Sequence, residues 1–353
     1  MATTEIDGAR AEAFAGRTIQ LLNDPMLSLL LSVGHQTQLL DVLAERGPVT
    51  SDELAAAADL DERYVREWLA GLTVGGIVED DDGRYTLPPE HAGSITRAAG
   101  PNNLALLAQY TALFGELEQR IVERFRKGGG IDYAEMPRFQ ALQAELSAQI
   151  YDGGLIEGTL PLVDGLTDRL RTGIDVLDVG SGYGHAVNLI ADAFPASRVT
   201  GIDISEEGVA AARAEAARLR LSNARFEVRD ALSIERGAYD LMTALDVIHD
   251  LPKPAETLAA IHGGLREGGV FLMVDIAASS HVHDNIEHPL GPALYTVSIF
   301  HCMTVSLANG GPGLGTMWGE QKALELLEQA GFRDVEIKRV EDDFLNAYYV
   351  ARK

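Results

Sequence analysis

The feature that most constrains the fold of this chain is a glycine-rich turn directly after a short apolar run. Residues 178–184 read Asp-Val-Gly-Ser-Gly-Tyr-Gly and follow the segment 174–177, which reads Ile-Asp-Val-Leu. This order predicts a strand, a tight turn and then a helix over 185–194. Glycines adopt backbone conformations that other residues avoid and carry no side chain, so such a turn can lie close to a ligand. The segment therefore predicts a ligand-binding unit of an α/β protein.

The spacing of the glycines distinguishes between ligands. A dinucleotide-binding turn has two residues between its second and third glycines, and the pyrophosphate rests on the helix N-terminus. Here only Tyr183 separates Gly182 from Gly184. The pattern Asp-x-Gly-x-Gly-x-Gly resembles the first motif of the class I S-adenosylmethionine-dependent methyltransferases. The resemblance implies S-adenosylmethionine as the cofactor, contacted by Asp178, Gly180, Ser181, Gly182 and Gly184.

Acids at the ends of the next two predicted strands agree with this resemblance. The strand over 198–204 ends beside Asp203, 19 positions beyond Gly184. An acid about 20 residues after the turn is placed to accept hydrogen bonds from both ribose hydroxyls. The strand over 225–230 ends in Asp230, which in the resembled family accepts a hydrogen bond from the adenine amino group. The expected cofactor site also includes Ile204, Ala231, Leu245 and Asp246.

The rest of the second half fits the same architecture. Further helices and strands are predicted over 239–245, 255–265, 269–275, 320–331, 334–340 and 344–352. A terminal hairpin after five strand–helix units resembles the antiparallel last strand of this methyltransferase class. The expected fold class is α/β, a Rossmann-like seven-stranded methyltransferase domain over 171–353 preceded by a mostly α-helical winged-helix domain.

Composition favours a soluble, cytoplasmic enzyme. The chain has 353 residues, of which 46% are apolar, enough for two or three domains with cores. Its one cysteine, Cys302, excludes an intrachain disulfide and suits a reducing compartment. The first ten residues lack an apolar core, and no unbroken apolar stretch approaches the ~20 residues that cross a bilayer. We therefore expect neither a secretory signal nor a membrane partner.

Residues 1–95 predict a separate domain. Helices over 27–46, 51–58 and 61–71, followed by a hairpin over 75–87, resemble a winged helix-turn-helix. However, residues 1–95 contain 6 basic and 17 acidic side chains, and the hairpin turn reads Asp-Asp-Asp-Gly. Because DNA-binding proteins neutralise phosphates with Lys and Arg, we expect no nucleic-acid partner. Small-molecule O-methyltransferases use such a domain as a dimer interface, so the resemblance implies a homodimer.

A helical connector is expected over 96–170. Apolar residues at helical spacing predict helices over 101–127 and 137–166, separated by three glycines at 128–130. Core and dimer packing explain most of these apolar residues. Tyr151 could in addition line the cofactor or substrate pocket.

His249 is the candidate residue for proton removal during methyl transfer. Methyl transfer to oxygen requires alignment of the nucleophile with the methyl group and removal of the hydroxyl proton, and histidine suits proton removal near neutral pH. His249 and Asp250 follow the strand over 239–245 and resemble the histidine–aspartate pair that carries the base in winged-helix O-methyltransferases. Those enzymes usually have tryptophan at the next position, where this chain has Leu251. A base, a pocket-lining residue and a structural residue all remain open roles for His249.

A long insert over 277–318 matches the substrate-covering element of the same family. Its aromatic residues and methionines suit an apolar or planar small-molecule acceptor bearing a hydroxyl, and they include Tyr295, Phe300, Met303 and Trp318. His283 and Glu287 would face together on a helix, but mixed charges on an exposed lid explain them, so no metal site is expected. Two alternatives stay open. They are an S-adenosylmethionine-responsive DNA-binding regulator and a binding protein without turnover.

Overall fold

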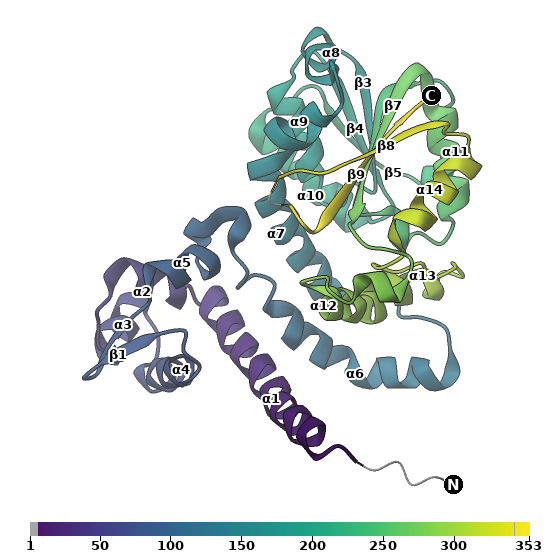
Figure 1. Ribbon diagram of the computed structural model, residues 1–353. Coiled ribbons are helices and arrows are strands. Elements are labelled where there is room, and N and C mark those ends of the chain that lie inside the picture. The colour runs from purple at the N-terminus through teal and green to yellow at the C-terminus, as the bar shows by residue number, and fades with distance from the viewer. Residues whose placement is uncertain (1–5, 342) are drawn as a thin grey trace. The chain divides into compact units, whose positions relative to one another are not determined.

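The computed structural model (Figure 1) describes residues 6–341 and 343–353, apart from the side chain of residue 137. The chain divides into two compact units, Met1–Glu116 and Leu117–Lys353. The division falls within helix α6, Gln109–Lys127, in the segment that the sequence assigns to the connector.

The first unit is helical with one small hairpin. Its helices are α1 (Gly8–Gln36), α2 (Leu39–Arg46), α3 (Ser51–Ala58), α4 (Glu62–Val74), α5 (Pro89–Ile95) and the 3-10 helix η1 (Arg97–Asn102), and its strands are β1 (Glu79–Asp81) and β2 (Arg84–Thr86). The predicted capped start of α3 is confirmed, because Thr50 and Glu53 form a reciprocal capping box. Leu54, Leu69 and Leu72 are fully buried between the helices. The winged-helix arrangement is therefore confirmed.

The predicted single helix over 27–46 is wrong. The chain leaves the helix at Gln38, whose φ of 62° is left-handed, and α1 begins much earlier, at Gly8. This break lets Leu40 turn into the core beside Trp68. The approach is so close at Gly34 that a Cβ atom there would lie 2.6 Å from Trp68 Cζ2. Tertiary packing thus overrides the local helical pattern.

The predicted helix start at residue 101 is also wrong, because α6 begins only at Gln109. Gly100 adopts a φ of 56° directly before Pro101. Two residues on, the side chain of Asn103 accepts a hydrogen bond from the backbone N–H of Ala105 at 3.2 Å. Such local side-chain bonds offer the backbone an alternative to the helix.

The second unit contains a seven-stranded sheet in the order β5-β4-β3-β6-β7-β9-β8. The strands are β3 (Asp175–Val179), β4 (Arg198–Asp203), β5 (Ala224–Val228), β6 (Tyr239–Leu245), β7 (Leu265–Ile276), β8 (Asp334–Lys338) and β9 (Asn346–Arg352). The first five are parallel, and β9 runs antiparallel to both β7 and β8. The predicted Rossmann-like, seven-stranded fold is confirmed. Strand β3 pairs with β4 on one side and β6 on the other, so the strand order reverses there, where α/β sheets bind ligands.

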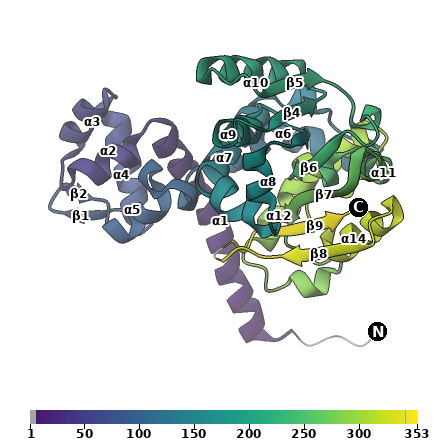
Figure 2. The same cartoon turned by 90° about the horizontal axis from the view of Figure 1, so that it is seen from above.

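Helices cover both faces of this sheet (Figures 1 and 2). One face packs against α8 (Leu166–Thr172), α9 (His185–Ala193) and α10 (Glu206–Leu219), and the other against α11 (Pro254–Gly264) and α14 (Gly319–Ala330). Val176 points to the first core and Leu177 to the second, as the period of two along a strand requires. Helix α7 (Pro137–Gly154) continues through a π-helical turn η3 (Leu155–Thr159) and a 3-10 turn η4 (Leu160–Leu162).

The insert after β7 is largely helical. It contains the 3-10 helix η7 (Val282–Asn285), α12 (Gly291–Val297), the π-helical turn η8 (Ser298–Cys302) and α13 (Met303–Ala308). The run Gly291–Ala308 is long and apolar enough for a membrane span by length and composition alone, and 39% of it is buried in the protein. The N–H of Ile131 donates a hydrogen bond to Thr304 Oγ1 at 2.9 Å, so this run is packed against the chain that precedes α7.

Candidate active site

The three motif glycines take left-handed conformations, with φ of 73° at Gly180, 51° at Gly182 and 77° at Gly184. Gly184 is also required sterically, since a Cβ atom there would lie 2.4 Å from Ala212 Cβ and 2.5 Å from Phe226 Cε1. A Cβ atom on Gly182 would meet nothing within 4 Å. Gly184 therefore serves helix packing, whereas Gly182 leaves open space above the turn.

Asp203 holds this turn at the end of β4. Its Oδ2 accepts a hydrogen bond from Gly182 N, and its Oδ1 accepts one from Ser205 N, both at 2.8 Å. Each carboxylate oxygen has two lone pairs, so both oxygens can still accept hydrogen bonds from ligand hydroxyls. The predicted ribose-binding acid is therefore rigidly positioned and only half-buried.

Asp178 lies beneath the turn and is buried. Its Oδ1 accepts a hydrogen bond from the Thr243 hydroxyl at 2.5 Å. Burial raises the pKa of Asp178 to about 7, the Thr243 hydrogen bond opposes this rise, and the nearby Asp203 adds to it. Tyr151 of α7 has a pKa well above its ordinary value because of burial and the nearby carboxyls of Asp246 and Asp178. The structure thus brings Tyr151 to this edge of the sheet.

The remaining predicted cofactor residues line the same edge of the sheet. Asp230 is exposed, and its Oδ1 accepts a hydrogen bond from Leu232 N at 2.8 Å, which caps the short 3-10 helix η5 (Ala231–Ser233). Ile204 exposes 74% of its surface at the end of β4. Leu245 is buried at the end of β6, and Asp246 follows it.

Asp246 has an unusual backbone, with a φ of 60°. Burial raises the pKa of Asp246 to about 6, His249 lowers it, and Asp275 and Asp250 raise it. Within the described part of the chain, its Oδ1 accepts no hydrogen bond. A strained residue with an unsatisfied carboxylate oxygen, placed where the sheet order reverses, is typical of a functional site.

His249 is 2% exposed and lies between two carboxylates. Its Nδ1–H donates a hydrogen bond to Asp275 Oδ1 at 2.8 Å, and its Nε2 lies 3.3 Å from Asp250 Oδ1. Burial lowers the pKa of His249, but Asp275 and Asp250 outweigh that effect, so the pKa is raised well above its ordinary value. The histidine is therefore more basic than the free side chain on which the sequence argument relied.

Sequence reasoning missed the support of this histidine. Asp275, at the end of β7, is fully buried and also accepts a hydrogen bond from Trp318 Nε1 at 2.9 Å. Trp318 is itself buried, so it supports Asp275, whereas the sequence assigned it to the acceptor-covering lid. The one available signal was that Asp275 is another acid at a strand end.

A second buried histidine lies nearby. His301 of η8 stacks on Phe139 with ring centroids 3.4 Å apart and meets Tyr133 edge-on at 5.6 Å. Burial lowers the pKa of His301 to about 4. Its Nδ1 lies 3.7 Å from Cys302 Sγ, and burial raises the pKa of that thiol to about 12.

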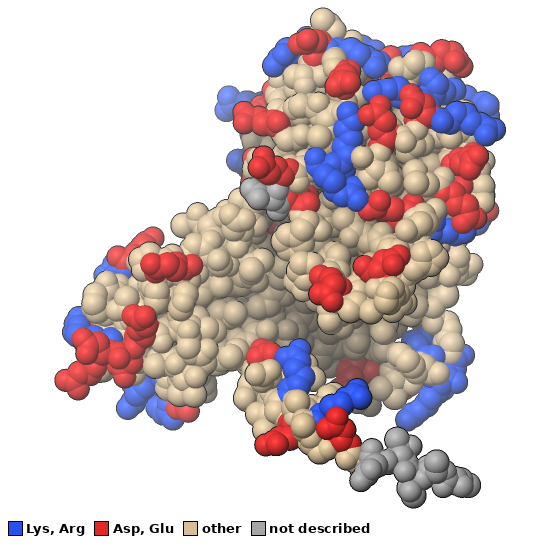
Figure 3. Space-filling view, viewed as in Figure 1, with Lys and Arg blue, Asp and Glu red and all other residues tan. Residues whose placement is uncertain are grey.

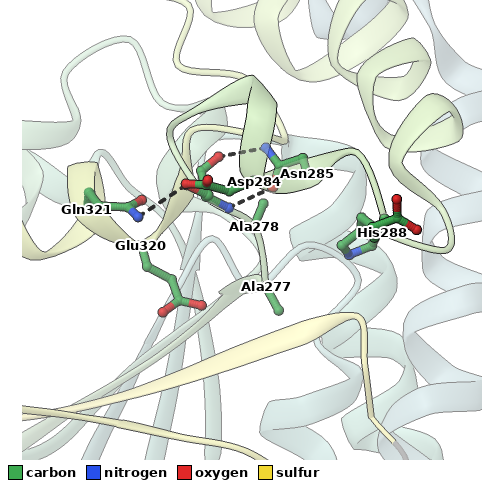
Figure 4. Close-up of a pocket in the computed structure, with 9 residues that line it drawn as sticks. Ala277, Ala278, Asp284, Asn285, His288, Glu320 and Gln321 are labelled. Atoms are coloured by element: carbon green, nitrogen blue, oxygen red, sulfur yellow. Dashed lines mark hydrogen bonds between the residues drawn. The ribbon is translucent and has the colours of Figure 1, made fainter.

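A separate open hollow of ≈490 Å³ lies within the insert region (Figure 4). It is lined by Ala277, Ala278, Ser279, Asp284, Asn285, Glu287, His288, Glu320 and Gln321. None of the predicted cofactor or catalytic residues is among them. Glu287 lines this hollow but His283 does not, so the pair named from the sequence does not share it.

Comparisons with known proteins match both units. The Rv2258c-like winged HTH domain matches residues 25–97, and a methyltransferase domain matches residues 170–331. Trans-aconitate 2-methyltransferase of Deinococcus radiodurans is 36% identical over 115 residues, covering 33% of this chain and 41% of that protein. Nocamycin O-methyltransferase of Saccharothrix syringae is 34% identical over 122 residues, covering 32% and 44%. The chain thus spans about two fifths of the length of these curated relatives.

Solved structures resemble the whole chain. A putative O-methyltransferase from Nostoc punctiforme has a TM-score of 0.72 at 19% identity, covering 96% of this chain and 98% of that one. Human N-acetylserotonin methyltransferase, solved in complex with SAM, has a TM-score of 0.68 at 18% identity, covering 100% and 99%. Identities this low show the fold. The two domain matches show that the chain carries a winged-helix domain followed by an S-adenosylmethionine-dependent methyltransferase domain.

Proposed function

We propose that this protein transfers a methyl group from S-adenosylmethionine to a hydroxyl of a small, aromatic or otherwise apolar acceptor. The observation that carries the proposal is the position of buried His249, with its Asp275 support, beside the glycine turn and its acids. The relatives named as methyltransferases support the same reaction class.

Each proposed cofactor contact has a matching group in the chain. Asp203 offers lone pairs to the ribose hydroxyls and Asp230 to the adenine amino group. Asp178, when ionised, offers a buried negative charge to the ammonium group of the amino-acid end. Ser181 Oγ is buried and forms no hydrogen bond with the described residues. The bound cofactor would supply a methyl group activated by a sulfonium.

The residues around His249 provide for removal of the proton from the acceptor hydroxyl. His249 would accept the proton of the acceptor hydroxyl. Asp275 holds the imidazole through Nδ1 and would stabilise the imidazolium that forms. The flanking carboxylates raise the pKa of His249, so the neutral imidazole that accepts the proton is favoured only at a pH above its ordinary pKa. Asp250 Oδ1 lies 3.3 Å from Nε2, the nitrogen that would accept the proton, and its charge would stabilise the imidazolium that forms.

Calorimetry with S-adenosylhomocysteine tests the cofactor site. Asp203→Ala should weaken binding by about 1–3 kcal/mol, because charge-assisted hydrogen bonds are left unmade. Asp192→Ala, an exposed acid of α9, is the matched control and should bind like the parent. Equal affinity of Asp203→Ala and the control would place the ribose elsewhere. Release of S-adenosylhomocysteine across a panel of hydroxylated aromatic acceptors then tests turnover and excludes a binding protein without activity.

The regulator alternative is not favoured by the charges of the first unit. On α4, Arg63 and Arg66 form ion pairs with Glu67 and Glu62 at 2.5 and 2.9 Å. The hairpin carries an acidic tip, and red side chains gather over it in Figure 3. We propose that duplex DNA is not a partner, and fluorescence anisotropy at physiological salt tests this.

We also propose a cytoplasmic homodimer. The free thiol of Cys302 suits a reducing compartment. Helix α1 is exposed from Gly8 through Asp24 and carries large apolar side chains there. Exposed apolar surface of this kind is typical of an interface between protein chains.

A further inference from the structure

A buried histidine of the insert has a ring nitrogen without a partner. His301 of η8 is 2% exposed, and its Nε2 forms no hydrogen bond with any residue that the structure describes. A buried polar atom left unpaired is costly for a folded protein, and an unmodified core rarely keeps one. We propose that the Nε2–H of His301 donates a hydrogen bond to a carbonyl oxygen of the methyl acceptor, separate from the hydroxyl that is methylated. The inference rests on the proposed function and narrows its acceptor to hydroxylated carbonyl compounds.

His301 lies beside the proposed base. The carboxylate of Asp250 is between the two histidines, because its Oδ1 lies 3.3 Å from His249 Nε2 and its Oδ2 lies 3.9 Å from His301 Nδ1. Only one carboxylate therefore separates the two imidazole rings. A single small molecule whose hydroxyl reaches His249 is then positioned to contact His301 with a second group.

The contacts of Nδ1 determine which nitrogen of His301 carries the hydrogen. Asp250 Oδ2, at 3.9 Å, is beyond hydrogen-bond distance. Cys302 Sγ lies 3.7 Å from Nδ1, which is within reach of a sulfur hydrogen bond. Burial raises the pKa of the Cys302 thiol to about 12, so the thiol keeps its hydrogen and donates it to Nδ1. A neutral imidazole has one donor and one acceptor nitrogen, so Nε2 is the donor.

The ring of His301 is neutral and held in place. Burial lowers the pKa of His301 to about 4, so the ring carries no charge at neutral pH. Phe139 stacks on it with ring centroids 3.4 Å apart, and Tyr133 meets it edge-on at 5.6 Å. Hydrogen bonds to a carboxylate are strongest from a charged donor, so a neutral N–H favours a carbonyl over a carboxylate.

The carboxylates near His249 give the acceptor a direction. Oδ1 of Asp250 and Oδ2 of Asp275 also lack partners among the described residues, and ionised carboxylates only accept hydrogen bonds. A hydroxyl is favoured beside them and a carbonyl oxygen is disfavoured. The donor of His301 therefore selects the orientation in which the hydroxyl, and not the carbonyl, faces His249.

The test compares matched pairs of two-ring phenols that differ only in the carbonyl. The ortho, meta and para hydroxybenzophenones carry it, and the corresponding benzylphenols have a methylene group instead. Calorimetry on the full-length protein with S-adenosylhomocysteine present should show at least one hydroxybenzophenone binding about tenfold or more tighter than its benzylphenol. His301→Phe keeps an aromatic ring but removes the donor, so it should weaken that hydroxybenzophenone by about 5–100-fold and leave the benzylphenol nearly unchanged.

Two further variants separate hydrogen bonding from packing. His301→Gln places an amide N–H near the position of Nε2 and should restore part of the preference for the carbonyl compound. His283→Ala, an exposed histidine of the insert, is the matched control and should keep the full preference. Calorimetry with S-adenosylhomocysteine alone reports whether each variant retains an intact cofactor domain, and His301→Gln remains informative if His301→Phe does not fold.

Nitrogen-15 spectra of the histidine rings give a readout that packing does not change. The resonances of His301, identified by their loss in His301→Gln, should show a neutral ring with its hydrogen on Nε2 down to about pH 5. Addition of the binding hydroxybenzophenone should shift the Nε2 resonance, and the matched benzylphenol should not. A ring protonated on Nδ1, or charged at neutral pH, would overturn the proposal.

The proposal also fails if no hydroxybenzophenone binds, if the two members of every pair bind equally, or if the preference survives in His301→Phe. These failures are distinguishable from failure of the proposed function. A hydroxybenzophenone that binds through His301 but never releases S-adenosylhomocysteine would contradict methyl transfer to its hydroxyl and support the recognition. Turnover of phenols that is unaffected by His301→Phe would contradict the recognition alone.

Discussion

At the scale of single residues, Asp178 illustrates a conflict between stability and binding. Burial raises the pKa of Asp178 from 3.8 to about 7, so the folded protein favours its protonated form. The unfolding free energy should therefore fall as pH rises from about 4 to about 7. Asp178→Asn keeps an acceptor for Thr243 and removes the buried charge. It should raise the unfolding free energy at pH 8 by about 1–3 kcal/mol, and have little effect at pH 4, in urea denaturation.

The same residue should make cofactor binding depend on pH in the opposite direction. The proposed contact with the ammonium group of the amino-acid end requires the ionised carboxylate, so affinity for S-adenosylhomocysteine should fall by up to about tenfold per pH unit below 7. Calorimetry between about pH 5.5 and 8.5, a range that spans this pKa, measures the affinity. The Asp178→Asn variant should bind S-adenosylhomocysteine weakly, with an affinity that does not depend on pH. A variant that loses both stability and affinity would show that Asp178 acts through packing and not charge.

His249 is the residue on which turnover should depend. His249→Ala should lower turnover by ~10²–10⁴, the span typical of lost acid–base help, while cofactor affinity stays within a few tenths of a kcal/mol. Asp275→Asn should lower turnover as well, because it removes the charge that stabilises the imidazolium. Asp250→Asn should have a smaller effect. Turnover of His249→Ala equal to that of the parent would contradict the base assignment.

At the scale of elements, the glycines of the turn after β3 have two different roles, because Gly184 allows close packing and Gly182 leaves open space for a ligand. Gly184→Ala places a Cβ atom 2.4 Å from Ala212, at a φ of 77°, so it should destabilise the protein by more than the ~1–2 kcal/mol of left-handed strain alone. Gly182→Ala meets open space and should cost about that strain only, while weakening cofactor binding. Thermal unfolding and calorimetry of the pair test this. Equal destabilisation would contradict the steric difference.

The same elements show what could be predicted from the sequence. The turn and Asp203 were predictable because strand, glycines and acid lie within about 20 residues and follow one local pattern. The support of His249 was not predictable, because Asp275 lies 26 positions from His249, and Trp318 lies 43 positions from Asp275, which it bonds. No periodic pattern encodes such contacts. The break at Gln38 was missed for a related reason, since Trp68 of another helix determines it.

At the scale of the whole molecule, charge and apolar surface are distributed unevenly. The formal net charge is −24, and 17 acidic side chains lie in residues 1–95. This charge favours solubility and opposes contact with phosphates. Yet Phe14, Leu22 and Met26 of α1 are each at least 60% exposed. An acidic chain that exposes such residues along one helix supports the proposal of a protein interface on that helix.

The last prediction concerns that helix. Helical spacing places Phe14, Leu22 and Met26 on one half of α1, while Arg17 and Asp24 form a 3.8 Å ion pair on the other. A helix amphipathic in this way, with its apolar half exposed, should be buried against a second copy. Light scattering should therefore report a dimer at micromolar concentration, and the double variant Phe14→Glu, Leu22→Glu should be a monomer. Gln20→Glu, on the polar half, should remain dimeric. The two glutamates should disrupt the dimer because burial of charged side chains at an apolar contact is strongly unfavourable. A monomeric parent would contradict the dimer, and a dimer unaffected by the double variant would place the interface elsewhere.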